Sequence, residues 1–328
     1  MPVNKSISVI IPNYNGRHLL EEFLPFTFAA TENAGVEYEI IVIDDASKDD
    51  SIAFIQSVYS QIKLIVNTEN KGFSYSCNRG IESSTCDLVL LLNSDVKLHP
   101  DYFEHQFNYF DEADTFGVMG RIIDMEGDKI QDSARIARFN GLKIKTDFYY
   151  TLNPSDKNYS FYLSGANALI DANKLKELGG FNELFSPFYG EDLELSLRAW
   201  RLGWKCYYEH QSVCRHKASA STKNYKTPKW VKSIYYRNRF YVHAIHLNNL
   251  YVLVWFLQIT VIDFIPKLLF GNFWIWKSYT GLLKSLPEIR KSRYQIKKMM
   301  VKRGSRMSIF DLAKLIKQSI QKKDILCP

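Results

Sequence analysis

Leu88-Val89-Leu90-Leu91-Leu92-Asn93-Ser94-Asp95 is the stretch of sequence that decides the fold. Its five apolar residues form an unbroken run, and a short run of this kind is typical of a strand buried on both faces of a parallel sheet. Open α/β sheets bind their ligands at the carboxyl ends of such strands. The stretch therefore predicts an α/β domain with a ligand-binding crevice beside Asp95.

Further strand-like runs lie on both sides of this stretch. They cover residues 7–12, 39–43, 62–66, 116–123, 161–170 and 204–209. Helical patterns lie between several of them, beginning near Arg17, including Asn78, and beginning at Glu191. Strands that alternate with helices at this spacing indicate βαβ units and a parallel sheet. Residues 124–160 are mixed and polar, and we expect them to form an excursion over one side of the crevice.

The net charge of +7 conceals a strong asymmetry. Residues 1–214 carry 19 Lys and Arg against 31 Asp and Glu, a net charge of −12, whereas residues 215–328 carry 23 against 4, a net charge of +19. A split of this size indicates an acidic ligand-binding half and a basic tail that faces nucleic acid or an anionic membrane surface.

The cysteines and the N-terminus indicate the compartment. The five cysteines are scattered and form no CxxC pair, which is typical of reduced thiols in the cytosol. The first residues lack the basic and then apolar pattern of a secretory signal. We therefore expect the acidic half to stay on the cytoplasmic side.

Residues 250–276 are apolar and aromatic enough to raise the question of a membrane span. Asp263 and Lys267 oppose a span because charged groups are costly at the centre of a bilayer, and Pro266 and Gly271 interrupt the run. Three alternatives remain: a span, an interfacial amphipathic region, or a helical subdomain packed on the core. The Trp and Phe residues beside Lys and Arg fit the interfacial alternative best.

Two groups of polar residues follow predicted strands. Asn13 and Asn15 follow the first strand and Asp44-Asp45 the second, where short amides and carboxylates can bind a base and a ribose or simply form turns. Asp95 follows the central strand. Its carboxylate is a ligand that a hard divalent cation prefers, and Mg²⁺ typically binds one or two carboxylates together with substrate phosphates. We therefore expect Asp95 to hold a cation that in turn holds a diphosphate.

Two further groups lie later in the chain. Glu191-Asp192 begins a predicted helix, where a carboxylate can deprotonate a hydroxyl group or can merely complement the helix dipole. His216 follows the last predicted strand. A neutral imidazole there can complete a metal shell begun by Asp95, which suits Mn²⁺ better than Mg²⁺.

Taken in chain order, the motifs that contain these residues resemble those of a known family. The runs PNYNG, VIDDAS, NKGFSYSCNRGI, LLLNSDV, SGANALI, GGFNELF and GEDLELSLRAWRLGW are similar to those of the inverting family 2 glycosyltransferases with the GT-A fold. The resemblance is strongest to the branch of bacterial rhamnosyltransferases and related O-antigen and cell-wall transferases. It implies a GT-A domain over residues 1–222. Residues 223–328 are then expected to form a mostly helical, basic and aromatic extension that associates with the membrane or packs as a subdomain.

The resemblance also implies roles for individual residues. Asp192, with Glu191 beside it, is the expected catalytic pair, and Asp192 is the expected general base. Asp95 and His216 are the expected ligands of Mg²⁺ or Mn²⁺. Asn93 replaces the first Asp of a strict DxD motif, so we expect Asp95 to carry the metal contact. The residues expected to line the nucleotide-sugar site are Pro12, Asn13, Tyr14, Asn15, Asp44, Asp45, Gly72, Asn78, Arg79 and Asn93.

The expected reaction is a metal-dependent, inverting transfer of a sugar from dTDP-rhamnose or a UDP-sugar to a hydroxyl group of a glycan. We expect the acceptor to be carried on a membrane lipid and the protein to act in surface polysaccharide assembly. It should lie on the cytoplasmic side, peripheral on the inner face of the cell membrane, and should bind no nucleic acid.

Two alternatives belong to other classes. A sugar nucleotidyltransferase would need a Gly-rich loop bearing Arg or Lys after the first strand, where Pro12-Asn13-Tyr14-Asn15-Gly16 stands instead. A non-catalytic nucleic-acid-binding protein would use the basic tail.

Overall fold

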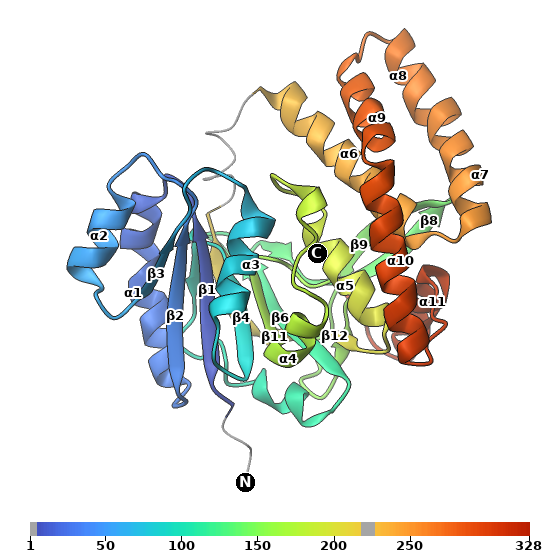
Figure 1. The fold of residues 1–328 in the computed structure, drawn as a ribbon. Helices are drawn as coiled ribbons and strands as arrows, with labels where there is room; N and C mark the ends of the chain where they lie inside the picture. Colours follow the sequence, from blue (N-terminus) through green and yellow to red (C-terminus); the bar gives the residue numbers. More distant parts are fainter. Residues whose placement is uncertain (1–4, 218–226) are drawn as a thin grey trace.

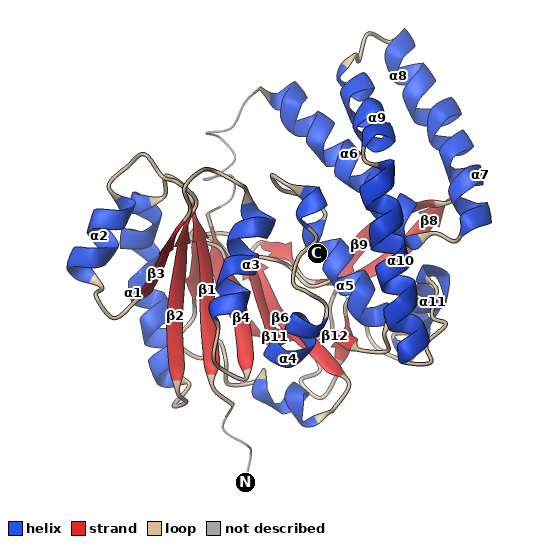
Figure 2. Ribbon diagram, in the orientation of Figure 1, coloured by secondary structure: helices blue, strands red, loops and turns tan. Residues whose placement is uncertain are grey.

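A mixed ten-stranded sheet forms the centre of the protein (Figures 1 and 2), whose computed structural model describes residues 5–217 and 227–328. The main path of hydrogen-bonded neighbours is β10-β12-β6-β11-β4-β1-β2-β3, with β5 beside β12 and β7 beside β6. The strands of this sheet are β1 (Ile7–Asn13), β2 (Tyr38–Asp44), β3 (Lys63–Val66), β4 (Leu88–Leu92), β5 (Val96–Leu98), β6 (Thr115–Ile123), β7 (Ile130–Asp132), β10 (Asn158–Tyr159), β11 (Asn167–Asp171) and β12 (Lys205–His216).

The central strand β4 is buried on both faces, as its sequence predicts. Val89 and Leu91 point into the apolar core on one face of the sheet, and the other three leucines point into the core on the opposite face. The strands β3, β2, β1 and β4 are parallel, whereas β11 runs antiparallel between β4 and β6. The parallel half of the sheet therefore directs the ends of β1, β2 and β4 to one edge.

Helices cover both faces of the sheet. One face packs against α1 (Arg17–Asn33), α2 (Ser51–Val58) and the short η1 (Phe107–Asp111). The other face packs against α3 (Phe73–Ser83), α4 (Ala172–Glu177) and α5 (Glu191–Arg201), with the short η2 (Glu183–Phe185) between the last two. This three-layer arrangement confirms the predicted α/β class.

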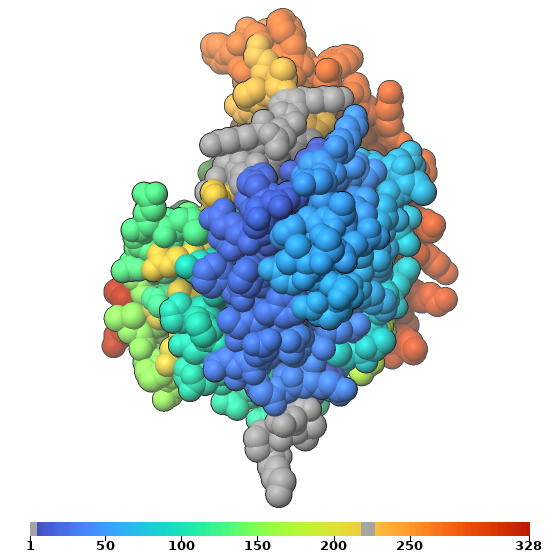
Figure 3. Space-filling view, turned by 90° about the vertical axis from the view of Figure 1, so that its left-hand side faces the viewer, coloured from blue at the N-terminus to red at the C-terminus, as the bar shows by residue number. Residues whose placement is uncertain are grey.

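The C-terminal region is helical, as predicted, and it packs on the same face of the sheet as α5. A single apolar core extends from Ile10 of β1 through α5 to Trp255 and Ile316. In Figure 3 the helices coloured yellow to orange project above the rest of the molecule. The helical elements are α6 (Pro228–His246), α7 (Asn249–Ile259), the π-helical η4 (Thr260–Phe264), α8 (Ile265–Leu269), α9 (Trp274–Lys284), α10 (Leu286–Lys302) and α11 (Ile309–Ser319). The predicted boundary between residues 222 and 223 lies outside the described residues.

The structure differs from the predicted strands at two places. Only the last part of the run 161–170 is a strand, because residues 164–166 form a loop whose Ala166 carbonyl accepts a hydrogen bond from the Asn93 N–H at 3.2 Å. The run 204–209 extends to His216, because β12 pairs with β6 along its length and with β5 at its end.

The polar excursion 124–160 forms mainly a separate hairpin of β8 (Ala134–Asn140) and β9 (Lys143–Tyr149). The turn of this hairpin lies against α7, where the side chain of Gln258 binds the Leu142 N–H and the Asn140 carbonyl.

Candidate active site

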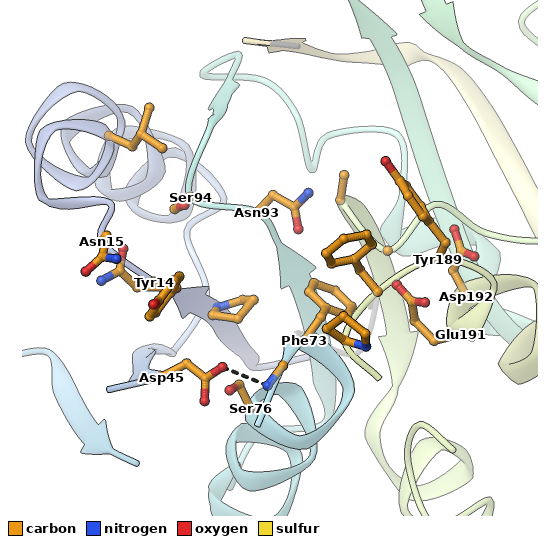
Figure 4. Close-up of a pocket in the computed structure, with 18 of the residues that line it drawn as sticks. Tyr14, Asn15, Asp45, Phe73, Ser76, Asn93, Ser94, Tyr189, Glu191 and Asp192 are labelled. Carbon is orange, nitrogen blue, oxygen red and sulfur yellow. Dashed lines mark hydrogen bonds between the residues drawn. The ribbon is translucent and has the colours of Figure 1, made fainter. Parts of the chain in front are cut away.

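The carboxyl ends of β1, β2 and β4 open into a cavity of about 290 Å³ (Figure 4). Figure 4 shows Tyr14, Asn15 and Asp45 at one end of the cavity and Glu191 and Asp192 at the other. The structure thus brings together most of the predicted site residues. Those that line the cavity are Pro12, Asn13, Tyr14, Asn15, Asp45, Gly72, Asn93, Glu191 and Asp192.

Asp45 is the most extensively bonded acid at the first end. One carboxylate oxygen accepts from the Asn67 amide at 2.7 Å and the Lys71 N–H at 3.0 Å, and the other accepts from the Gly72 N–H at 2.8 Å. Gly72 has a φ of 88°, and a Cβ there would lie 2.9 Å from the Pro187 backbone. The carboxylate therefore holds the loop before α3 closely over the cavity floor.

Asp44 lies beneath the cavity and organises the turns around it. Its carboxylate accepts from the Asn13 amide at 2.9 Å and from the Ser47 N–H at 2.8 Å. The hydroxyl of Ser47 in turn accepts from the Asn15 N–H. Because Asn13 and Asp44 are paired in the β1–β2 register, this contact follows directly from the sheet.

Asn78 and Arg79 do not line the cavity. The amide of Asn78 binds both the N–H and the carbonyl of Phe181, and Arg79 donates to the Val66 carbonyl and the Asn67 side chain. These partners give both residues a structural role, and their predicted contact with a nucleotide stays a prediction.

Asp95 and His216 lie side by side although they are far apart in the sequence. Val96 pairs with His216 in the antiparallel β5–β12 ladder, which puts the Asp95 carboxylate 3.3 Å from His216 Nε2. The other ring nitrogen, Nδ1, lies 3.2 Å from the Gln131 side-chain oxygen. If Nδ1–H donates to that oxygen, the lone pair of Nε2 faces a carboxylate. Two electron-pair donors this close need a proton or a metal cation between them.

This pair fits a divalent cation in chemistry, since carboxylate oxygen and imidazole nitrogen are both ligands of Mn²⁺. Within residues 5–217 and 227–328 no group of three or more His, Cys, Asp or Glu could form a closed metal site. Asp95 is buried and does not itself line the cavity, but its neighbour Ser94 does.

Glu191 and Asp192 begin α5 at the far end of the cavity. Asp192 accepts a hydrogen bond from the Leu193 N–H at 2.7 Å, while one carboxylate oxygen of Glu191 is buried without a hydrogen-bond partner among the described residues. Burial, and then the charge of Asp192, raises the pKa of Glu191 to about 8. Burial also raises the pKa of Asp192, and the nearby Arg135 guanidinium opposes this rise. Burial therefore favours the protonated form of both carboxyl groups, and the Arg135 charge favours Asp192 as the member of the pair that ionises.

Arg135 is a site residue that the sequence did not single out. It comes from β8, is 7% exposed, forms an ion pair with Asp132 and lies over the Tyr162 ring with its guanidinium carbon 3.9 Å from the centroid. Its Nε and one Nη have no hydrogen-bond partner among the described residues. The hairpin thus supplies a buried cation whose charge favours the ionised form of Asp192.

Asn238 of α6 is a second residue that the sequence did not indicate. It is fully buried, and its amide nitrogen donates to the carbonyls of Phe185, Phe188 and Tyr189. These carbonyls belong to the loop before α5, in which Tyr189 has a φ of 76°. The C-terminal region therefore holds the loop that presents the acidic pair.

Comparison with known proteins places this chain in a family. Residues 8–179 match the sequence model of glycosyl transferase family 2. GalNAc-T7, solved with UDP, GalNAc and Mn²⁺, is similar with a TM-score of 0.64 and 14% identity, over 99% of this chain and 59% of that one. This chain therefore spans about three fifths of that relative.

Two further solved structures match almost the whole of this chain. The mannosyltransferase PcManGT from Pyrobaculum calidifontis, in complex with GDP-Man and Mn²⁺, has a TM-score of 0.53 and 14% identity over 97% of this chain and 81% of its own. S. aureus TarS 1-349 in complex with UDP-GlcNAc has a TM-score of 0.53 and 15% identity over 97% and 92%. At these identities the likeness shows the fold.

The family match selects glycosyl transfer over the nucleotidyltransferase and the non-catalytic alternative, while the rhamnosyltransferase branch stays a prediction. The chain belongs to glycosyl transferase family 2 and has the GT-A fold.

Proposed function

We propose that this glycosyltransferase moves a sugar from a nucleotide-diphosphate donor to a hydroxyl group of a glycan acceptor, with inversion at the anomeric carbon. The observation that carries the proposal is that Asp45, Asn93 and Asp192 line one continuous cavity. Such a cavity can hold a donor along its length and leave its sugar next to a base.

The donor lies along the ends of β1, β2 and β4. Pro12 and Tyr14 flank the base, and Asp45 and the neighbouring amides bind the nucleoside. Asn93 and Ser94 lie nearest the diphosphate. This assignment is supported by the lining of the cavity and by the rule that open α/β sheets bind ligands at their carboxyl edge.

Asp95 and His216 would hold the cation, Mg²⁺ or Mn²⁺. Their separation of 3.3 Å and their ligand types support this role. Bound there, the cation would neutralise the negative charge that develops on the departing nucleoside diphosphate. Two protein ligands would leave the cation able to bind donor phosphates as well.

Asp192 is the general base. It takes the proton of the acceptor hydroxyl while the hydroxyl oxygen bonds to the anomeric carbon from the face opposite the diphosphate. The bond from that carbon to the diphosphate breaks, and the nucleoside diphosphate leaves with the electron pair. Glu191, whose pKa burial raises to about 8, lies beside Asp192 as a neutral acid that can donate a hydrogen bond to the bound substrates.

The proposed donor is dTDP-rhamnose or a UDP-sugar, and the proposed acceptor is a lipid-linked glycan in surface polysaccharide assembly. The resemblance of the motifs supports the donor class. The basic and aromatic C-terminal region supports an acceptor at an anionic membrane.

Two amide substitutions test the roles of the acidic pair. Asp192→Asn removes the base, so transfer should fall about 10³-fold or more while donor binding remains. The matched variant Glu191→Gln keeps a neutral hydrogen-bond donor and should lose no more than about tenfold. Sugar transfer and donor affinity are measured for both variants. Near-normal transfer by Asp192→Asn would contradict the assignment of the base.

A further inference from the structure

One helical rod of the C-terminal region exposes an apolar face that no described part of the chain covers. The rod joins α7, η4 and α8 into a continuous helix, Asn249–Leu269, which is long and apolar enough to cross a membrane. The loop after it and the first turn of α9 continue the exposed apolar surface to Trp276. Twelve of the 24 exposed large hydrophobic residues of the described chain lie between residues 250 and 276.

These exposed side chains recur at helical spacing, so they share one face. We call this face the apolar ridge, and it consists of Leu250, Leu253, Val254, Leu257, Val261, Ile265 and Leu269, extended by Phe270, Phe273 and Trp276. At 1.5 Å per residue the helical part is about 30 Å long. A continuous apolar surface of this length marks an interaction site.

Other side chains of the same rod fix it to the protein. Trp255 is 1% exposed and stacks on His243 with ring centroids 5.4 Å apart. Gln258 binds the turn of the β8–β9 hairpin, and the Asp263 carboxylate binds Lys143 and Lys267 at 2.6 Å each. A spanning helix would have to carry this hairpin and these charges into the bilayer, which is costly. The rod therefore suits an orientation parallel to the membrane plane.

The charges around the ridge match an anionic surface. Residues 228–302 carry 13 Lys and Arg but only Asp263 and Glu288 as acids, and Asp263 is already paired with two lysines. A groove of about 340 Å³ between α6 and α9 is lined by three cationic residues, Arg237, Lys277 and Lys284. Lys277 directly follows Trp276 at the end of the ridge. This combination of an apolar face, terminal aromatic residues and flanking cations fits phospholipid acyl chains and anionic headgroups.

We propose that the apolar ridge inserts into the headgroup region of an anionic bilayer and holds the enzyme on the membrane with the rod lying in the membrane plane. The ridge takes up acyl-chain contacts, and the basic groove faces lipid phosphates. Membrane binding through the ridge does not depend on the catalytic roles proposed above. The test of lipid binding and the test of sugar transfer can therefore give independent results.

Vesicle flotation tests the proposal. The full chain is mixed with phosphatidylcholine vesicles, or with vesicles of about one phosphatidylglycerol to three phosphatidylcholines, at low and high salt. We expect flotation with the anionic vesicles and weaker binding at high salt or without phosphatidylglycerol. The double variant Leu253→Gln/Leu257→Gln should bind about tenfold more weakly, since both side chains lose their apolar contact.

The matched control is Val58→Gln/Leu152→Gln. These side chains are 56% and 66% exposed, against 70% and 64% for the ridge pair, and they lie outside the C-terminal region. The control should bind like the unchanged protein. Equal binding by the ridge variant and the control, or no binding to either vesicle, would overturn the proposal. A concentration-dependent dimer in light scattering that the ridge variant abolishes would also overturn it, because a second copy would then cover the ridge.

Cysteine labelling separates an in-plane rod from a span. Asn249→Cys and Lys277→Cys are introduced one at a time in a Cys327→Ser background, because Cys327 is exposed. On vesicles with protein added from outside, a membrane-impermeant maleimide should label both positions. Protection of one end alone would show that the rod crosses the bilayer and would overturn the in-plane seating.

Discussion

At the scale of single residues, the proposed chemistry depends on two adjacent carboxyl groups in different surroundings. Asp192 accepts a backbone hydrogen bond and is near the Arg135 cation, whereas Glu191 has a buried oxygen without a described partner. Burial thus raises the pKa of both carboxyl groups, and the Arg135 charge favours Asp192 as the one that ionises. Pairs of acids with separated pKa values are typical of acid–base sites.

The pH dependence of transfer should reflect the charge of Arg135. Asp192 must be ionised to act as the base, so kcat/KM should fall as the pH drops through the pKa of Asp192, which burial raises. Arg135→Met removes the cation that favours ionisation, and the acid limb of the pH profile should move to higher pH. Arg135→Lys keeps the charge and should leave the limb closer to that of the unchanged enzyme.

The measurement is kcat/KM against pH for the unchanged enzyme and both variants. An acid limb that stays at the same pH in Arg135→Met would mean that Arg135 does not tune the base. The same comparison separates this role from a structural one, since a general loss of folded enzyme lowers activity without moving the limb.

At the scale of elements, α6 connects the C-terminal region to the active site. The Asn238 amide holds the carbonyls of the loop before α5, and Arg237 donates to the Ser186 carbonyl of the same loop. The position of Asp192 therefore depends on a helix that lies outside the motifs of the GT-A core.

Asn238→Ala should lower kcat more than it raises the KM for the donor. The substitution leaves buried carbonyls without a donor, which costs about 1–3 kcal/mol of stability and frees the loop that carries the base. The matched variant Asn248→Ala removes an asparagine that caps α7 far from this loop, and it should leave kcat nearly unchanged. Steady-state kinetics and thermal unfolding of both variants check this. Equal kcat values for the two variants would contradict the positioning role.

The sequence could predict the parts of the fold that local pattern determines. The run 88–92 predicted the buried central strand, and the helical pattern beginning at Glu191 predicted α5. The contact of His216 is one that the local sequence pattern could not predict. Its contact with Asp95 depends on the β5–β12 register, which forms between segments more than a hundred residues apart. The sequence therefore offered His216 as a metal ligand by its chemistry and by the family resemblance, and not by a local pattern. The roles of Arg135 and Asn238 were not predicted, because no local pattern shows that Arg135 lies near Asp192 or that Asn238 binds the loop before α5.

At the scale of the whole molecule, the catalytic sheet and the C-terminal helices share one core. Phe185 packs edge-to-face on Tyr241, and Phe139 lies against Phe310 with ring centroids 4.6 Å apart. The helices therefore contribute to folding as well as to the membrane contact proposed for them.

A fragment of residues 1–222 should not fold stably. Removing the C-terminal helices would expose the apolar face of α5 and the apolar side chains of the hairpin to water. We expect the free energy lost with this burial to exceed the total unfolding free energy of about 5–15 kcal/mol that is typical of a domain. Circular dichroism during heating should show no cooperative transition for the fragment. A soluble fragment with a sharp transition would show that residues 1–222 are an independent domain.

The most direct test of the central claim is calorimetric titration of UDP, dTDP and GDP into the enzyme with and without Mn²⁺. We expect one nucleotide to bind only when Mn²⁺ is present, Asp95→Asn to remove this binding, and Asp192→Asn to leave it intact. Metal-independent binding, or equal binding by Asp95→Asn, would contradict the proposed metal site.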